Sequence, residues 1–263
     1  MSEHGPSIPG GRRVKAVQTT CRILTALRDL DGAGVTELSD HLDLAKATVH
    51  SHLATLADNE LVVKHGDSYD VSLRFVDFGE YAKSRVDIYE ITKAEVERLA
   101  DETEEVAQFM VEEHGKGVYL HKKRGNNAIQ TASYAGNRKS LHCTALGKAI
   151  LSQLSRDRVD RIVRDEGIQK RTENTITTRE ELYDELDRIR EQQVAFDDEE
   201  ILPGLRCVAA PVRHPTGDIQ GAISISGPTT RFTGERFDEE LPEIVRGAAN
   251  VIELNATQLS ERS

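Results

Sequence analysis

The chain has 263 residues, of which 38% are hydrophobic, and a net charge of -11. This length exceeds one typical domain of roughly 100–150 residues, so two domains are expected. No stretch approaches the roughly 18 uninterrupted apolar residues of a membrane span, and the first residues lack a hydrophobic signal core, so we expect a cytoplasmic protein with no membrane partner.

A polar tail, residues 1–13, precedes the first hydrophobic pattern, which predicts a winged helix-turn-helix over residues 14–76. Turn residues 29–34 are expected to end the first helix, and two further helices follow, the last from about 45 to 58. The buried face of the first helix is predicted to hold Val17, Cys21, Leu24 and Leu27.

The third predicted helix has a small, polar outer face opposite a buried stripe of Val49, Leu53 and Leu56. Such a face suits the major groove, because bulky side chains would hold the helix axis away from the base edges. Two short strands around residues 65–68 then read as a wing. The DNA-binding residues are therefore predicted to be Lys46, Ala47, Thr48, His50 and Ser51 on the helix, with Lys64 and His65 on the wing.

The acidic charge is segregated away from this end of the chain. Up to Phe75 there are eight basic and ten acidic residues, a balance of -2, so -9 of the total lies in the remainder. The 34 basic residues comprise 11 lysines and 23 arginines. An acidic, lysine-poor composition resembles proteins of salt-loving cells, and we expect a halophilic archaeon, in which base readout and DNA shape must contribute more to affinity than counterion release.

Residues 77–90 are predicted to form a linker helix, and residues 91–263 a larger α+β domain. Its period-two strands alternate with helices, which favours an antiparallel sheet flanked by helices. Ser155 and the Thr178/Glu181 pair are expected to cap helices, strands are predicted near 129–132, 208–212 and 219–226, and a last helix spans about 237–259.

Three features of this domain could carry chemistry. Ser224 and Ser226 share one face of the last strand, which could equally be a strand face open to water. The helix that begins near Thr144 has free N–H groups that could hold an anion, or is an ordinary small-residue start packed on the sheet. The acidic run 197–200, beside a loop and a buried strand with Cys207, could also be only a solvated loop.

Four stretches in order resemble the isocitrate lyase regulator (IclR) family, and the resemblance covers about residues 14–259. The stretches are Leu141–Ala149, Phe196–Glu200, Pro203–Val212 and Ala222–Pro228. The resemblance implies a winged helix that binds double-stranded DNA and a GAF-like domain that binds small metabolites, often organic acids. It also implies homodimers or homotetramers that repress or activate catabolic genes.

The resemblance further implies an effector pocket at the positions singled out above, namely Ala145, Leu146, Asp197, Leu205, Cys207, Ser224 and Ser226. This chain has Leu146 where relatives often carry glycine or another small residue, and Ala45 and Ala47 where serine or proline and serine are frequent. A bulkier pocket lining would change which ligand fits, and one or two DNA contacts would be missing.

The residues suggest how such a pocket would bind a ligand. A carboxylate would accept hydrogen bonds from backbone N–H groups near Ala145 and Leu146 and from the hydroxyls of Ser224 and Ser226, with no arginine required. Asp197 is unfavourable beside a carboxylate unless it is protonated or receives a ligand hydroxyl, so a hydroxy acid, keto acid hydrate or sugar acid is expected.

Three other readings stay open. A hydrolase could use Cys207, His142 and Asp197, although no Gly-x-Ser-x-Gly elbow or Walker loop is present. A metal could be held by His142, Cys143 and Cys207, but their spacing is no known ligand motif, and no metal or cofactor is expected. The C-terminal domain could also be a dimerisation module that binds no metabolite.

Overall fold

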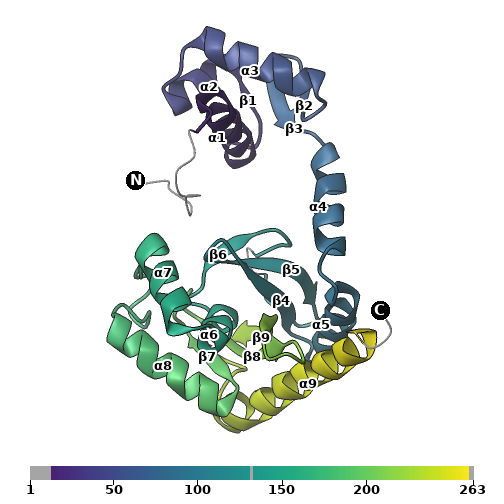
Figure 1. The fold of residues 1–263 in the computed structure, drawn as a ribbon, viewed down its shortest axis with the longest axis vertical. Helices are drawn as coiled ribbons and strands as arrows, with labels where there is room; N and C mark the ends of the chain where they lie inside the picture. The colour runs from purple at the N-terminus through teal and green to yellow at the C-terminus, as the bar shows by residue number, and fades with distance from the viewer. Residues whose placement is uncertain (1–12, 131–132, 261–263) are drawn as a thin grey trace. The chain divides into compact units, whose positions relative to one another are not determined.

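The computed structural model describes residues 13–130 and 133–260, so nearly all of the expected tail 1–13 lies outside the described residues. The described part divides into two units, one ending at Arg85 and the other beginning at Val86. Figure 1 labels the elements of both units.

The first unit is a winged helix. Its helices are α1 (Lys15–Asp29), α2 (Val35–Leu42) and α3 (Lys46–Asp58). A small antiparallel sheet has the strand order β1-β3-β2, from Ala33–Gly34, Ser68–Val71 and Val62–His65. The short strand β1 lies in the segment expected to be only a turn, where Ala33 pairs with Tyr69.

Of the four residues predicted to be buried on α1, Leu27 is buried and Leu24 packs partly buried against the core, but Val17 and Cys21 were predicted wrongly. The buried residues of α1 are Thr19, Ile23, Ala26 and Leu27, whereas Cys21 is exposed and Val17 is 60% exposed. Leu27 belongs to both the predicted and the observed set of buried residues. Because successive residues lie 100° apart around a helix, the predicted and observed buried faces are only part of a turn apart. The side chain of Arg22 donates to the carbonyl of Leu42 at 3.0 Å, which shows the side of α1 that faces α2.

The linker helix predicted over 77–90 ends earlier, at Ser84. Helix α4 (Arg74–Ser84) buries none of its residues, and α5 (Tyr89–Thr103) begins after a non-helical turn at 85–88. Helix α5 buries Val96 and Leu99 in the core of the second unit. Only α4 therefore has the character of a linker.

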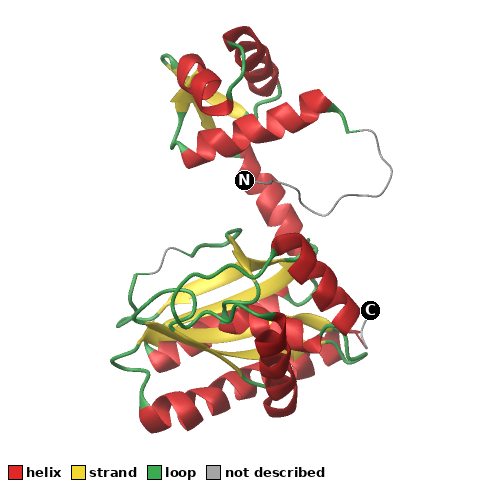
Figure 2. Ribbon diagram, turned by 90° about the vertical axis from the view of Figure 1, so that its left-hand side faces the viewer, coloured by secondary structure: helices red, strands yellow, loops and turns green. Residues whose placement is uncertain are grey.

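The second unit is built on a six-stranded antiparallel sheet (Figure 2), with the strand order β6-β5-β4-β9-β8-β7. The strands are β4 (Val106–Glu113), β5 (Lys116–Arg124), β6 (Arg138–Ser140), β7 (Ala195–Asp198), β8 (Leu205–Arg213) and β9 (Ile219–Pro228). The edge strand β6 was not predicted; of the strand expected near 129–132, residues 129–130 are not in a strand and 131–132 lie outside the described residues.

Helices cover both faces of this sheet (Figures 1 and 2). Helix α5 and the C-terminal helix α9 (Leu241–Ser260), which follows a π-helical turn at Arg236–Glu240, pack on one face around Phe109 and Ile223. Helices α6 (Ala145–Gln153), α7 (Arg156–Glu166) and α8 (Arg179–Gln192) belong to the core of the other face. The predicted α+β class, with a winged helix and a helix-flanked antiparallel sheet, is confirmed.

The predicted helix caps are also present. The hydroxyl of Ser155 accepts from the N–H of Arg158 at 3.3 Å, and that of Thr178 accepts from Glu181 at 3.2 Å. Each cap satisfies a first-turn donor that has no partner within its helix. These starts fix where α7 and α8 run beside α6.

Candidate functional site

Strand pairing places the polar residues of the sheet on its α6 side. In the sheet, Ser226 lies opposite Cys207, and Ser224 lies opposite both Ala209 and Gln108. Because side chains alternate along a strand, Ile223 and Ile225 point the other way and pack in the core formed with α5 and α9. The serine face is therefore not a strand face open to water, since Ser224 is fully buried.

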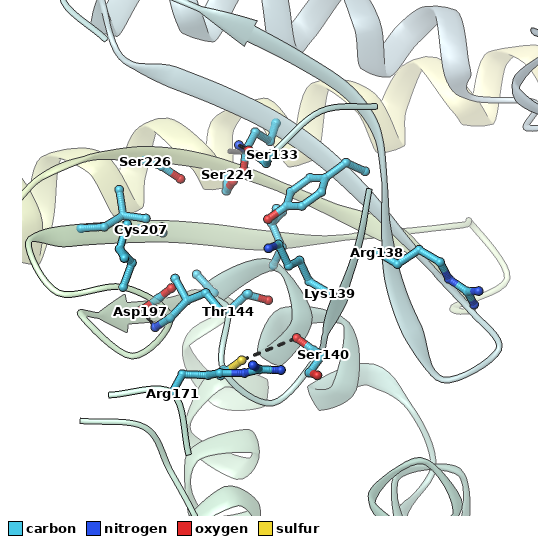
Figure 3. Close-up of a pocket in the computed structure, with 18 of the residues that line it drawn as sticks. Ser133, Arg138, Lys139, Ser140, Thr144, Arg171, Asp197, Cys207, Ser224 and Ser226 are labelled. Carbon is cyan, nitrogen blue, oxygen red and sulfur yellow. Dashed lines mark hydrogen bonds between the residues drawn. The ribbon is translucent and has the colours of Figure 1, made fainter. Parts of the chain in front are cut away.

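This polar face forms one wall of a cavity of about 470 Å³ (Figure 3). The other walls come from the start of α6, the loop around residues 201–205, strand β6 and Arg171. All seven residues predicted for the effector pocket line this one cavity, namely Ala145, Leu146, Asp197, Leu205, Cys207, Ser224 and Ser226. Cavities of roughly 300–1,000 Å³ are typical of small-molecule sites.

The start of α6 presents backbone donors to the cavity. Thr144 caps the helix, since its hydroxyl accepts from the N–H of Gly147 at 3.0 Å. The N–H groups of Ala145 and Leu146 lie in the first turn, where the helix has no carbonyl oxygen to accept from them. They are therefore available to another partner. A side chain at Gly147 would meet the carbonyl oxygen of Leu141 at 2.1 Å, so glycine allows the helix start to pack this closely on the preceding segment.

Asp197, on β7, is a fully buried carboxyl group with one oxygen satisfied. Its Oδ1 accepts from the N–H groups of Glu200 at 2.8 Å and Ile201 at 3.4 Å, while its Oδ2 has no hydrogen-bond partner within the described residues. Burial, reinforced by the charge of Glu200, raises the pKa of Asp197 to about 7, and Lys148 acts in the opposite direction. The group can therefore exist as an acid or as a carboxylate near neutral pH.

A second buried polar atom faces the same space without a partner. The hydroxyl of Ser224 is buried and makes no hydrogen bond to any described residue. An unsatisfied buried polar atom is costly, and a bound ligand that supplies the missing hydrogen bond is one way to remove that cost. A ligand with both donors and acceptors would satisfy Ser224 and Asp197 together.

A buried lysine forms ion pairs behind the part of the cavity wall that carries Asp197. Lys148 of α6 is 1% exposed and forms ion pairs with Glu200 and, at 3.3 Å, with Glu185. The carbonyl of Glu200 also accepts from the hydroxyl of Thr175 at 2.7 Å. The reading of 197–200 as a solvated loop is therefore wrong for its two ends, because both Asp197 and Glu200 are buried.

Several cavity residues were absent from the sequence interpretation. Gln108 and Tyr119 come from β4 and β5, and strand alternation beside β9 could have indicated Gln108. Lys139 and Arg171 come from an unpredicted strand and from an irregular segment, so no sequence pattern indicated them. Burial raises the pKa of the Tyr119 hydroxyl, so it stays protonated and can donate.

The arrangement does not favour a thiol nucleophile. Burial raises the pKa of Cys143 to about 11 and that of Cys207 well above its ordinary value, so both remain thiols. The ring Nε2 of His142 lies 3.0 Å from the carbonyl oxygen of Gln169, and burial lowers the pKa of His142. Within the described residues, no group of three or more His, Cys, Asp and Glu side chains is arranged to hold a metal.

In the first unit, α3 presents the face that the sequence predicts. Val49, Leu53 and Leu56 are buried, and all seven predicted DNA-contacting residues are exposed, namely Lys46, Ala47, Thr48, His50, Ser51, Lys64 and His65. The hydroxyl of Ser51 donates to the carbonyl of Ala47 at 2.9 Å, so it lies along the helix and keeps the outer surface low.

Family models match both units of the chain. The IclR helix-turn-helix domain matches residues 16–66, and the C-terminal domain of the bacterial transcriptional regulator IclR matches residues 81–254. The chain belongs to the IclR family of transcriptional regulators. An IclR-family regulator has a helix-turn-helix domain that binds DNA and a C-terminal domain that binds an effector, so the winged helix and the cavity-bearing unit are these two parts.

Individual relatives agree with this assignment. The chain is 32% identical over 247 residues to the transcriptional regulator ArcR of the halophilic archaeon Halobacterium salinarum, covering 92% of this chain and 94% of the relative. It is 34% identical over 228 residues to the regulator KdgR of Escherichia coli, covering 86% and 87%. An IclR homologue from Microbacterium hydrocarbonoxydans, solved with 4-hydroxybenzoate, shares the fold with a TM-score of 0.80 at 16% identity, covering 93% and 100%.

Within the described residues, no helix is long and apolar enough to cross a membrane.

Proposed function

We propose that this IclR-family regulator binds operator DNA as a homodimer or homotetramer in the cytoplasm and is controlled by a hydroxy acid, keto acid or sugar acid held in the cavity. The observation that carries the effector assignment is the pairing of two unsatisfied buried atoms, Asp197 Oδ2 and Ser224 Oγ, with the free N–H groups at the start of α6. These three groups would be satisfied by a ligand that accepts hydrogen bonds at one end and donates a hydrogen bond at the other.

The chemistry of the cavity narrows the ligand class. A carboxylate would accept from the N–H groups of Ala145 and Leu146 and from the hydroxyls of Ser224 and Ser226. A ligand hydroxyl would donate to Asp197 Oδ2, which removes the penalty of an unpartnered buried acceptor. The homologue solved with 4-hydroxybenzoate binds a compound that likewise joins a carboxylate to a hydroxyl.

The side chain of Leu146 gives one wall of the cavity an apolar surface. It is 3% exposed and lines the cavity, where it adds an apolar surface beside the backbone donors. The cavity therefore favours a ligand whose carbon chain, rather than a further polar group, lies against the start of α6.

For DNA recognition we assign α3 to the major groove, with Lys46, Thr48, His50 and Ser51 toward the bases and Lys64 and His65 of the wing near the backbone. The support is the exposure of this face, which the buried stripe of α3 fixes. Ala47 allows close approach to the groove and contributes no hydrogen bond. One helix and a wing bury too little surface for tight, specific binding, so two half-sites are needed.

The apolar surface of the winged-helix unit supports an oligomer. Exposed hydrophobic residues gather on and beside α4, which buries none of its residues; they are Leu73, Phe75, Val76, Phe78 and Tyr81, exposed by 36% to 85%. Contiguous apolar patches on a single chain usually mark an interaction site. Light scattering should show at least a dimer, and a monomer both free and on DNA would contradict the proposal.

The genes under control are expected to be catabolic, with the regulator acting as a repressor, an activator or both. Promoter mapping of the bound chain in cells tests this assignment. Enrichment of imperfect palindromes beside genes for the breakdown of acids or sugars is the expected result. Binding without any shared sequence would contradict it.

Two other functions are disfavoured by particular observations. A C-terminal domain that only dimerises would have no reason to bury unsatisfied polar atoms around a cavity, and stabilisation by any metabolite in a thermal-shift screen would count against it. A hydrolase based on Cys207, His142 and Asp197 would need a thiolate, whereas burial keeps the thiol protonated.

A further inference from the structure

A group of basic side chains stands at the cavity beside the start of α6. Arg138, Lys139 and Arg171 all line the cavity, and none of the three forms an ion pair with a carboxylate of the described residues. Lys116 also lines it but is engaged with Glu166 at 3.2 Å. These three side chains therefore bring positive charge to the cavity wall.

The other contacts of these three side chains leave their charge available. Arg171 donates to the side-chain oxygen of Gln169 at 3.2 Å, and Arg138 donates to the carbonyl oxygen of Glu113 at 3.2 Å. Both partners are neutral groups, so neither cancels the positive charge. Burial raises the pKa of Cys143, which lines the wall next to α6, and the charge of Arg171 opposes that rise, so Arg171 acts electrostatically on the cavity.

The cations and the serines lie in different parts of the cavity. In Figure 3, Ser224, Ser226 and Ser133 lie together above Thr144 at the start of α6, Arg171 lies below Thr144, and Arg138 lies apart from both at the right of the view. Asp197, the acidic side chain of the cavity wall, feels Glu200 and Lys148 rather than these cations. The two arginines therefore lie apart from the serines that would bind the ligand's first carboxylate.

We propose that the cavity has a second anion site, formed by Arg171, Lys139 and Arg138, and that the effector is a dianion with a second carboxylate or a phosphate in addition to the carboxylate at α6. This inference rests on the proposed function, because it takes the effector to be an acid bound at α6. A cavity of about 470 Å³ has room for a chain that separates two charged groups. Arginine and lysine bind carboxylate and phosphate through charge-assisted hydrogen bonds.

Calorimetry with three six-carbon sugar acids tests the proposal at one ionic strength. Gluconate has one carboxylate, glucarate has a carboxylate at each end, and 6-phosphogluconate has a phosphate in place of the second carboxylate. At least one dianion should bind the full-length chain about tenfold more tightly than gluconate, as expected for a partly desolvated charge pair. The preferred dianion identifies the second group as carboxylate or phosphate.

Substitutions test which residues are responsible for the tighter binding of the dianion. The double substitution R171Q/K139Q should remove the dianion preference and leave gluconate affinity within about twofold. The control K170Q removes one positive charge next to Arg171, from a side chain that pairs with Glu173 and lies outside the cavity lining, and should leave the preference intact.

The possible failures are distinguishable. If gluconate binds and neither dianion binds more tightly, the second anion site is absent while the proposed function stands. If R171Q/K139Q weakens gluconate and the dianions equally, the cations serve the α6 carboxylate and the second site is again contradicted. If none of the three acids binds, the proposed acid class fails, and this inference fails with it.

Discussion

The backbone N–H of Glu200 donates to Oδ1 of Asp197 at 2.8 Å, and this contact leaves Oδ2 as the carboxyl oxygen available to the cavity. The geometry comes from the turn that follows β7, in which the next residues fold back over the carboxyl group. Together with the N–H of Ile201, the N–H of Glu200 orients the carboxyl group that we expect to accept a ligand hydroxyl. The same turn buries the carboxyl group of Asp197, which can titrate.

That burial predicts a pH-dependent stability. The pKa of Asp197 rises from its ordinary value of 3.8 to about 7 in the folded chain. Between these values the unfolded chain has lost the proton that the folded chain keeps, so the free energy of unfolding falls as the pH rises from about 4 to 7. The variant D197N should therefore gain stability relative to wild type as the pH increases, measured by urea unfolding at pH 5 and pH 8. A difference that does not change between these pH values would contradict the assignment.

The two serines should contribute to ligand binding and not to DNA binding. The variant S224A/S226A should lose on the order of 1–3 kcal/mol of effector affinity, because two hydrogen bonds to the ligand are removed. Its operator affinity without effector should be nearly unchanged. Calorimetry with the effector measures the first quantity and fluorescence anisotropy the second. Full effector affinity in this variant would place the ligand elsewhere.

The recognition helix can be tested at one position. S51E should abolish operator binding, because a carboxylate and extra bulk at a groove-facing site cost more than the roughly 1–3 kcal/mol of one base contact. S51A is the matched control, since it keeps the surface low and should retain binding within about tenfold. Gel-shift titration of both folded variants measures the difference. Normal binding by S51E would mean that another face of α3 meets DNA.

Lys148 should be a major stabilising residue despite having no predicted contact with ligand or DNA. K148M should lower the free energy of unfolding by about 3–5 kcal/mol, because it leaves Glu200 buried without its cation, while Glu185 keeps only its ion pair with Arg188. The double variant K148M/E200Q should recover part of this loss. Urea unfolding of both proteins checks the prediction. An unchanged midpoint for K148M would show that the ion pairs contribute nothing.

The sequence predicted the elements whose pattern is local. The caps of Ser155 and Thr178 and the alternation of Ile223 with Ser224 need only neighbouring residues to be read. Val17 and Cys21 of α1 were wrongly predicted to be buried, because two hydrophobic faces share Leu27 and only the packing of the folded unit decides between them.

The cavity residues likewise divide into those that local sequence patterns indicate and those that they do not. Ser224, Asp197 and the start of α6 lie in recognisable motifs, so their convergence on one cavity could be predicted. Arg171 and Lys139 could not, because they reach the cavity from an irregular segment and a short edge strand whose positions depend on long-range contacts. The sequence interpretation, in which no arginine was required, consequently missed the basic part of the wall.

The measurement that tests the central claim most directly is the operator affinity of the full-length chain with and without a saturating acid effector. Fluorescence anisotropy on an operator taken from the promoter map should show a change of roughly 5- to 150-fold, corresponding to a coupling of about 1–3 kcal/mol between the two sites. The change should be absent in S224A/S226A at the same effector concentration. An operator affinity that stays constant in the wild-type chain, when calorimetry shows the cavity to be filled, would contradict control by the cavity.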